Sequence, residues 1–193
     1  MKNNTNAPPP PPLEMLGPKV ELMMNGIYMF ISDVTMESMG PVIEWILSAN
    51  LRPNKPKELT LGICSRGGDL NACFALVDII KGSKIPIRTV GLGMIASCGL
   101  LLFISGAKGT RTLTPNTAIL SHQYTWGKYG KEHELFAANK EMELTSKRIT
   151  EHYRKCTGLS EKDIKKHLMP PHDVWLSAKE AKKLGVCDNI KKL

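Results

Sequence analysis

The sequence has no long apolar run, and its N-terminus lacks a basic region followed by an apolar one. A membrane-spanning helix needs roughly 20 consecutive apolar residues, and a secretory signal needs a short apolar core behind a charged start. Neither pattern occurs, so we expect a soluble, cytoplasmic protein with no membrane partner.

Paired cysteines are also missing. The five cysteines are scattered, with no Cys-x-x-Cys motif and no Cys/His cluster of the kind that binds zinc. Four of them lie in apolar or helical stretches, as buried reduced thiols do in a cytosol-like compartment. We expect no metal ion and no cofactor.

Basic residues never form a run interleaved with stacking aromatics, although the net charge is +8. Lysines and arginines are interspersed with acidic residues, which is typical of solvated helix faces rather than of a groove that tracks phosphates. We therefore expect no nucleic-acid partner. Hydrophobic residues make up 42% of the 193 residues, enough for one domain with a sizeable core.

Prolines separate an N-terminal segment from the rest of the chain. Five consecutive prolines occupy residues 8–12, and Pro18 follows. Such a stretch is extended or disordered, so we predict a flexible segment over 1–18 and a single domain over 19–193. Folded structure is expected to start near Val20.

From there strand and helix patterns alternate. We predict strands at 22–31, 59–64, 87–92 and 117–120, and helices at 36–49, 69–81 and 96–105. This repeated βαβ order predicts an α/β fold with a largely parallel sheet layered with helices. Later elements are an exposed hairpin or strand extension at 124–131, helices at 132–156, 160–168 and 177–184, and strands at 174–176 and 186–190.

The predicted helix at 132–156 is long and charged, with few apolar positions. A helix with so thin an apolar stripe usually packs against something beyond its own domain. We therefore expect its packing partner to lie outside its own domain.

Ser97 lies where a predicted strand turns into a buried helix, in the segment Gly93-Met-Ile-Ala-Ser-Cys-Gly99. A helix N-terminus leaves amide N–H groups unpaired and carries partial positive charge. A hydroxyl there can attack a carbonyl while nearby amides stabilise the oxyanion. A helix cap is the simpler role for a lone serine at such a position.

Two more residues complete a serine-hydrolase hypothesis. His122 follows a predicted strand and could act as a general base, and Asp173 precedes a strand and could orient the imidazole. Each alone has an ordinary structural explanation, and only the combination with Ser97 favours catalysis. Amides near Gly68 and at Cys98 would form an oxyanion hole, because paired glycines let an amide face outward.

These motifs resemble those of the Clp protease proteolytic subunit, the ClpP family. The matching segments are Ser65-Arg-Gly-Gly68, the stretch around Ser97, Ser121-His-Gln123, Asp173-Val-Trp-Leu-Ser-Ala-Lys-Glu-Ala181 and Leu184-Gly-Val-Cys-Asp188. They occur in the family's order and at its spacing, from about residue 22 to residue 190.

The resemblance implies the ClpP/crotonase-like fold of repeated βαβ units with a protruding long helix. It implies a serine endopeptidase with Ser97 as nucleophile, His122 as base and Asp173 as orienting acid. Gly68 and Cys98 would supply the oxyanion hole. It also implies self-association into seven-membered rings stacked in pairs, a tetradecamer, which an ATP-hydrolysing AAA+ unfoldase of the Clp type feeds with unfolded polypeptide.

An extended substrate is expected to pair through its backbone with two parts of the chain. One is the turn at Gly67 and Gly68, and the other is the segment that starts at Tyr124 and Thr125. Main-chain pairing of this kind predicts loose side-chain specificity.

Several positions depart from the family's pattern. Arg66 and Tyr124 stand where proline is usual, Cys98 where methionine is usual, and His172 where an arginine joins contacts between rings. Two alternatives therefore stay open. One is a non-catalytic ring subunit or scaffold; the other is an acyl-CoA enzyme of the related crotonase-like fold, which also holds an oxyanion on paired amides.

Overall fold

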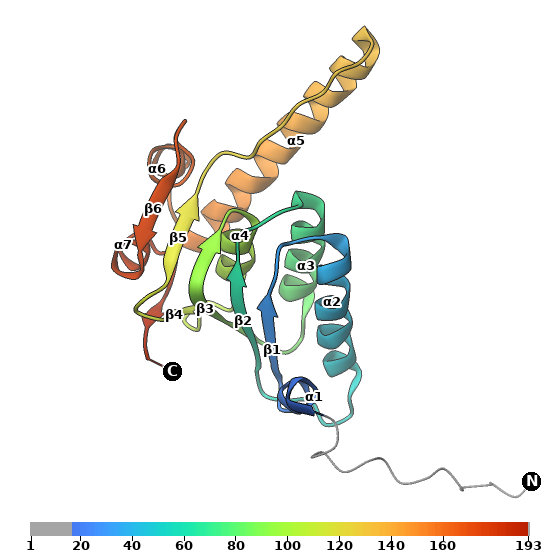
Figure 1. Ribbon diagram of the computed structural model, residues 1–193, viewed down its shortest axis with the longest axis vertical. Coiled ribbons are helices and arrows are strands. Elements are labelled where there is room, and N and C mark those ends of the chain that lie inside the picture. The colour runs from blue at the N-terminus through green and yellow to red at the C-terminus, as the bar shows by residue number, and fades with distance from the viewer. Residues whose placement is uncertain (1–16, 193) are drawn as a thin grey trace, which may run out of the picture.

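A computed structural model describes residues 17–192 of the chain. The proline run and the rest of the predicted flexible segment up to residue 16 lie outside the described residues. A mostly parallel sheet packs against helices, and one long helix, α5 (Glu132–Thr157), projects far from the rest of the molecule (Figure 1).

Three parallel strands with two crossover helices form the first half of the fold. The elements are β1 (Ile27–Ile31), α2 (Met36–Leu51), β2 (Leu59–Ser65), α3 (Leu70–Gly82) and β3 (Ile87–Ala96). The side chains of Thr35 and Asp69 each accept a hydrogen bond from the third amide of the helix that follows. Both helices therefore begin where the sequence predicts.

The second half of the sheet branches from β3. The first part of β3 pairs in parallel with β4 (Thr112–Leu113), and its second part pairs with β5 (Ala118–Ser121). β4 continues to β7 (Asn189–Ile190), while β5 pairs antiparallel with β6 (Val174–Ser177). The branch places the ends of β3 and β5 side by side.

Helices pack on one face of this sheet. α4 (Cys98–Ile104) follows β3 directly and is buried at every residue, with α3 and α5 against it. In β1, Tyr28 and Phe30 are buried, while Met29 and Ile31 on the opposite face are exposed. The outer face of the first strand is therefore uncovered in the subunit.

Two short helices complete the described residues. α6 (Glu161–His167) follows α5, and α7 (Ala178–Lys183) connects β6 to β7. None of the helices between residues 17 and 192 combines the length and the apolar character that crossing a bilayer requires.

The N-terminal part differs from the sequence-based expectation. Residues 22–26 are not strand: a helix, α1 (Gly17–Met24), precedes β1 and starts before the predicted boundary at Val20. Gly26, at a φ of +77°, reverses the chain between the two elements. Only a glycine adopts such a φ without strain, so the helix and the strand cannot be one continuous element.

The segment at 124–131 is extended but is neither a hairpin nor a strand. It runs alongside α5 toward the tip of that helix (Figure 1). The Tyr124 hydroxyl donates to the Met142 carbonyl at 3.0 Å, which fixes the segment to α5. The predicted hairpin or strand extension is therefore wrong.

Candidate active site

Ser97 occupies a sharp turn between β3 and α4. Its φ of 53° makes it the one residue other than glycine with a positive φ among residues 17–192, and its ψ is −121°. Such a backbone carries roughly 1–3 kcal/mol of strain, which the surrounding structure must hold. Ser97 is the N-cap residue of α4 by position, but its side chain makes no capping hydrogen bond, so the hydroxyl is not used to cap the helix.

Gly67 makes room for this turn. A Cβ on Gly67 would lie 2.6 Å from the Ser97 Cβ and 3.0 Å from the Cys98 amide nitrogen, and its φ is +102°. No other residue type fits there without moving the serine. The Ser97 N–H donates to the Leu120 carbonyl at 3.0 Å, which fixes the turn from the β5 side.

Two unpaired amides lie next to the serine. The N–H of Val34 donates to Gly67 O and the N–H of Asp69 donates to Val34 O, which leaves the Gly68 N–H without a partner in the described part of the chain. The Cys98 N–H is the first amide of α4 and has no acceptor within the helix. Both groups are available to a developing oxyanion.

The Cys98 side chain connects the two amide donors. Its thiol donates to the Gly68 carbonyl at 3.1 Å, so it joins the Gly68 peptide to the start of α4. Behind it, the Cys73 thiol donates to the Cys98 carbonyl at 3.4 Å. Burial raises the pKa of the Cys73 thiol well above its usual value, which keeps it protonated as a donor.

Strand pairing brings His122 and Asp173 together. Ser121 pairs with Val174 at the end of the β5–β6 ladder, so residues 122 and 173 follow on facing sides. The His122 Nδ1 lies 3.9 Å from the Asp173 Oδ1, which is longer than a hydrogen bond. Within residues 17–192 no hydrogen bond joins Ser97 to His122. Catalytic hydrogen bonds of unliganded enzymes are often long and shorten when substrate binds.

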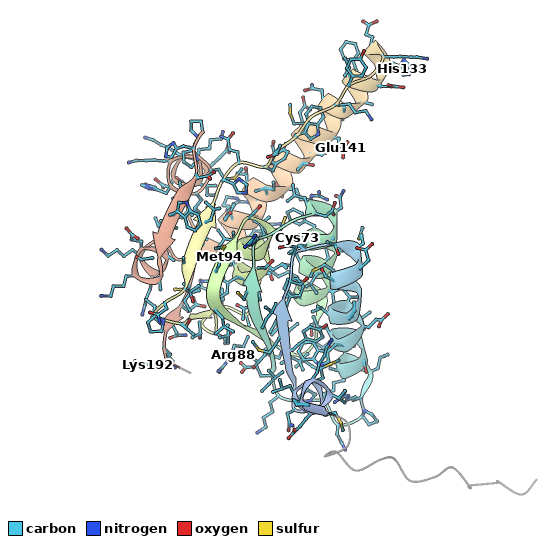
Figure 2. The ribbon with its side chains drawn as sticks, viewed as in Figure 1. Cys73, Arg88, Met94, His133, Glu141 and Lys192 are labelled. Atoms are coloured by element: carbon cyan, nitrogen blue, oxygen red, sulfur yellow. The ribbon has the colours of Figure 1, made fainter. Side chains whose placement is uncertain are left out.

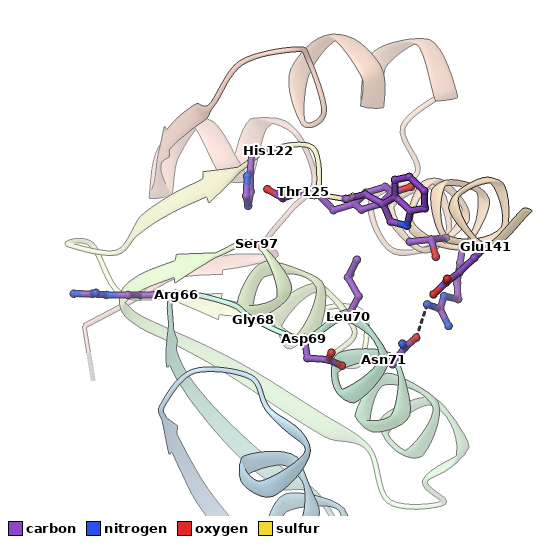
Figure 3. Close-up of a pocket in the computed structure, with 13 residues that line it drawn as sticks. Arg66, Gly68, Asp69, Leu70, Asn71, Ser97, His122, Thr125 and Glu141 are labelled. Carbon is purple, nitrogen blue, oxygen red and sulfur yellow. Dashed lines mark hydrogen bonds between the residues drawn. The ribbon is translucent and has the colours of Figure 1, made fainter. Parts of the chain in front are cut away.

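A pocket of about 490 Å³ contains both Ser97 and His122, which approach it from different elements (Figure 3). Gly68, Tyr124 and Thr125 also line it. Three other predicted site residues do not line the pocket. Gly67 lies against Ser97, Cys98 is buried beneath the turn, and Asp173 lies beyond the imidazole.

The far wall of the pocket contains residues that the sequence analysis missed. Glu141, Thr145 and Arg148 come from one face of α5, and Asn71 comes from the first turn of α3. The Arg148 guanidinium lies 4.4 Å from the centre of the Phe74 ring and donates to Asn71 Oδ1 at 3.0 Å. The spacing of 141, 145 and 148 on a predicted helix is a signal that could have grouped them.

The site's other charges do not form a metal centre. Between residues 17 and 192 there is no group of three His, Cys, Asp or Glu residues that could hold a metal ion. The Arg66 side chain points away from the other lining residues (Figure 3).

Comparisons with known proteins agree with this architecture. A profile of the family described as Clp protease matches residues 19–192. The chain is 35% identical over 165 residues to the ATP-dependent Clp protease proteolytic subunit 1 of Chlamydia abortus, covering 83% of each chain. It is 33% identical over 151 residues to the ATP-dependent Clp protease proteolytic subunit 2 of Treponema denticola, covering 78% of this chain and 74% of the relative.

The family match spans nearly all the residues that the structure describes, and it favours the peptidase hypothesis over the acyl-CoA alternative. The mostly parallel sheet and the projecting α5 are consistent with the family's fold. On both grounds, the chain belongs to the Clp protease family, as a divergent member.

Proposed function

We propose that this protein is a Clp-type serine endopeptidase subunit that hydrolyses peptide bonds of unfolded proteins. The observation that carries the proposal is the strained turn at Ser97, whose hydroxyl is not used to cap α4 and lies beside two unpaired amides. A serine held in this way, with an imidazole lining the same pocket, supports a role in nucleophilic catalysis.

In this mechanism the Ser97 Oγ attacks the carbonyl carbon of the scissile peptide bond. His122 takes the hydroxyl proton, and the amides of Gly68 and Cys98 stabilise the oxyanion. His122 then gives the proton to the leaving amine, which breaks the C–N bond and leaves an acyl-enzyme. Water, deprotonated by His122, hydrolyses that ester, and Asp173 steadies the imidazolium in both steps.

The extended segment at 124–131 supports binding of an unfolded substrate. Its residues lie outside any strand, and no backbone–backbone hydrogen bond of residues 17–192 involves the stretch 124–130. Free main-chain donors and acceptors of this kind can pair with an extended peptide. With the Gly67–Gly68 turn on the other side of the pocket, the peptide carbonyl would lie over Ser97.

Assembly into stacked seven-membered rings follows from the same family resemblance, and α5 supports it. This helix buries few of its residues, and Phe136 is 69% exposed and Leu144 58% exposed. Exposed apolar side chains on a projecting helix fit a contact with another subunit. An AAA+ unfoldase that hydrolyses ATP would deliver the substrate to the chamber.

One observation favours the alternative of a non-catalytic ring subunit. The His122 and Asp173 side chains are 3.9 Å apart and form no hydrogen bond, so the imidazole is not oriented in the isolated subunit. A catalytic subunit must close this distance on assembly or on substrate binding, whereas a scaffold need not.

Peptide hydrolysis by the purified particle distinguishes these two functions. We expect the wild-type protein to form a multi-subunit particle that cleaves short fluorogenic peptides. Ser97→Ala and His122→Ala should each lower the rate at least about a thousandfold without changing the native mass. Ser48→Ala, at an exposed position in α2 away from both the pocket and α5, is the matched control. A particle of full mass with no peptidase activity would support the scaffold.

A further inference from the structure

A second cavity lies at the opposite end of β3 from Ser97. Its volume is about 350 Å³, and its walls come from the end of α3, the start of β3, the end of α4 and the last turn of α5. No residue proposed for catalysis lines it. Its size lies in the range of sites that bind small molecules.

The lining of this cavity is cationic. No aspartate or glutamate lines it, whereas five basic side chains do: Lys81, Lys84, Lys108, Arg111 and Lys155. Arg88 and Lys192 lie at the same end of the sheet (Figure 2), but they line a different cavity, and Arg88 pairs with Glu58 at 2.9 Å. The positive charge of the cavity therefore comes from its own lining residues.

Arg111 does not contribute a free charge. It is buried, and its Nε and Nη2 donate to the carboxylate of Asp188 at 2.9 and 2.6 Å. Burial acts to raise the pKa of Asp188, but the hydrogen bonds from Arg111 hold that pKa below its usual value. This pair is a structural ion pair that stabilises the cavity wall.

The four lysines, in contrast, are exposed and unneutralised. None of them takes part in an ion pair with the described residues. The nearest acid on the same helix as Lys81 is Asp78, which does not line the cavity. Four ammonium groups around one cavity repel each other unless an anion lies between them.

Helix C-termini offer a simpler reason for lysines here, because three helices end near the cavity. Two of these end carbonyls, however, already have other donors: the Thr89 hydroxyl donates to Phe103 O in α4, and Arg111 Nη1 donates to Cys156 O in α5. These two carbonyls therefore do not need the ammonium groups as hydrogen-bond partners.

The floor of the cavity is rigid and apolar. It is formed by isoleucines that are no more than 6% exposed: Ile80, Ile85, Ile87 and Ile104. The Ser83 hydroxyl donates to the Ile85 carbonyl at 2.8 Å, which fixes the connection between α3 and β3. The exposed lysines therefore surround a cavity whose floor has a fixed position.

We propose that this cavity, the lysine pocket, binds a small molecule with two or more phosphate groups through Lys81, Lys84, Lys108 and Lys155. Lysine binds phosphate as a point charge, and several lysines around one cavity favour a multiply charged anion over a single phosphate. The site is separate from the peptidase pocket and does not depend on the proposed catalysis.

Calorimetric titration of the full-length protein with inorganic tripolyphosphate tests this proposal. The double variant K81Q/K155Q removes two charges from the pocket, and K162Q/K166Q removes two from exposed positions on α6 as the matched control. We expect one site per chain in the wild type, binding weakened roughly tenfold or more in K81Q/K155Q, and no change in the control. Inorganic monophosphate should bind more weakly than tripolyphosphate.

Absence of saturable binding to the wild type would overturn the proposal. An equal loss of tripolyphosphate affinity in K81Q/K155Q and K162Q/K166Q would also overturn it, because that result would reflect general attraction to surface charge. If K81Q/K155Q fails to fold, K84Q/K108Q removes the same charge from the loops around the pocket. Unchanged tripolyphosphate binding in a folded pocket variant would also contradict the assignment.

Discussion

Ser97 is held by its neighbours rather than by its own preferences. Its positive φ is one that a serine rarely adopts, and the contacts that impose it come from Gly67 on one side and the Leu120 carbonyl on the other. The serine hydroxyl is thus fixed at a turn where it satisfies no helix amide. The geometry of the site thus depends on a glycine and on a backbone carbonyl, neither of which reacts with the substrate.

Gly67→Ala tests that dependence. The new Cβ would clash with the Ser97 Cβ and would have to adopt a φ of +102°. We expect a loss of about 1–3 kcal/mol in the free energy of unfolding, and a fall in peptide hydrolysis well beyond what that loss explains. Urea unfolding and peptide hydrolysis measure the two effects.

Gly40→Ala is the matched control, because nothing lies within 4 Å of the added Cβ in the middle of α2. It should keep full activity and stabilise α2 by up to about 1 kcal/mol. Full activity in the Gly67→Ala variant would contradict this prediction, because it would show that the turn at Ser97 can move without loss of peptide hydrolysis.

Cys98 acts through the Gly68 carbonyl, so we class it as a positioning residue. Cys98→Ala removes the thiol donor at 3.1 Å and leaves the Gly68 peptide free to rotate. We expect kcat for a short peptide to fall about fivefold with little change in KM, because one hydrogen bond contributes about 1 kcal/mol. Cys98→Ser keeps a donor and should recover most of kcat; equal losses in both variants would contradict this role.

Sequence reasoning reached the residues of the turn but not the far wall of the pocket. Ser97, His122 and Asp173 each stand next to a strand end, and strand ends are visible in an apolar pattern. Arg148 joins the pocket because its guanidinium stacks on Phe74, which lies in a different helix. A contact of that kind depends on how α3 and α5 pack, and no local pattern predicts it.

At the scale of elements, His152 connects α5 to α4. Its Nε2 donates to the Leu101 carbonyl at 2.9 Å, and its ring meets the edge of Phe74. Burial lowers the pKa of His152 to about 4, with Lys81 and Lys155 acting in the same direction and Asp78 opposing them. The neutral imidazole is therefore the form that packs between the two helices.

This lowered pKa predicts that acid weakens the fold. The unfolded chain binds the proton near pH 6.5 and the folded chain only near pH 4, so stability falls as the pH drops from 6.5 toward 4. Between pH 7 and pH 5 the loss from this residue is about 2 kcal/mol. Urea unfolding at the two pH values measures it.

His152→Gln keeps a donor for Leu101 O but cannot titrate, so its stability should change with pH by about 2 kcal/mol less than that of the wild type. His133→Gln, at an exposed position on the same helix, should leave the pH dependence unchanged. If the free energy of unfolding changed with pH equally in His152→Gln and in the wild type, His152 would not be the cause of the acid destabilisation.

Elements with strong patterns were predictable, and those defined by pairing were not. The predictions for α2 and α3 were confirmed to within two residues at each end, because a capping residue and an apolar face mark them. β4 is two residues long and is defined only by its pairing with β3 and β7, so no local sequence pattern marks it. α1 buries none of its residues. Its apolar side chains therefore do not mark a core-facing side of a helix, and in the sequence they look like the start of the strand that follows.

At the scale of the whole molecule, α5 is the feature that a single subunit does not explain. Its outer part projects beyond the sheet, and Leu135, Phe136 and Leu144 are exposed there (Figure 1). An isolated helix of this kind gains little from tertiary packing. A second subunit would supply the missing contacts.

Phe136→Ser tests this assembly. We expect the variant to fold with unchanged secondary structure but to lose ring stacking, so that native mass spectrometry finds particles of half the wild-type mass. Burial of a phenylalanine at an interface contributes roughly 1.5–3 kcal/mol per copy, and the stacked form contains many copies. A variant with the full wild-type mass would mean that α5 does not join the rings at this position.

Active-site labelling tests the central claim most directly. The assembled wild-type protein is treated with a fluorophosphonate, digested, and mapped by mass spectrometry. The account predicts one phosphonylated residue, Ser97, with no adduct in Ser97→Ala and full labelling in Ser48→Ala. An assembled particle in which Ser97 stays unmodified while peptide hydrolysis continues would contradict it.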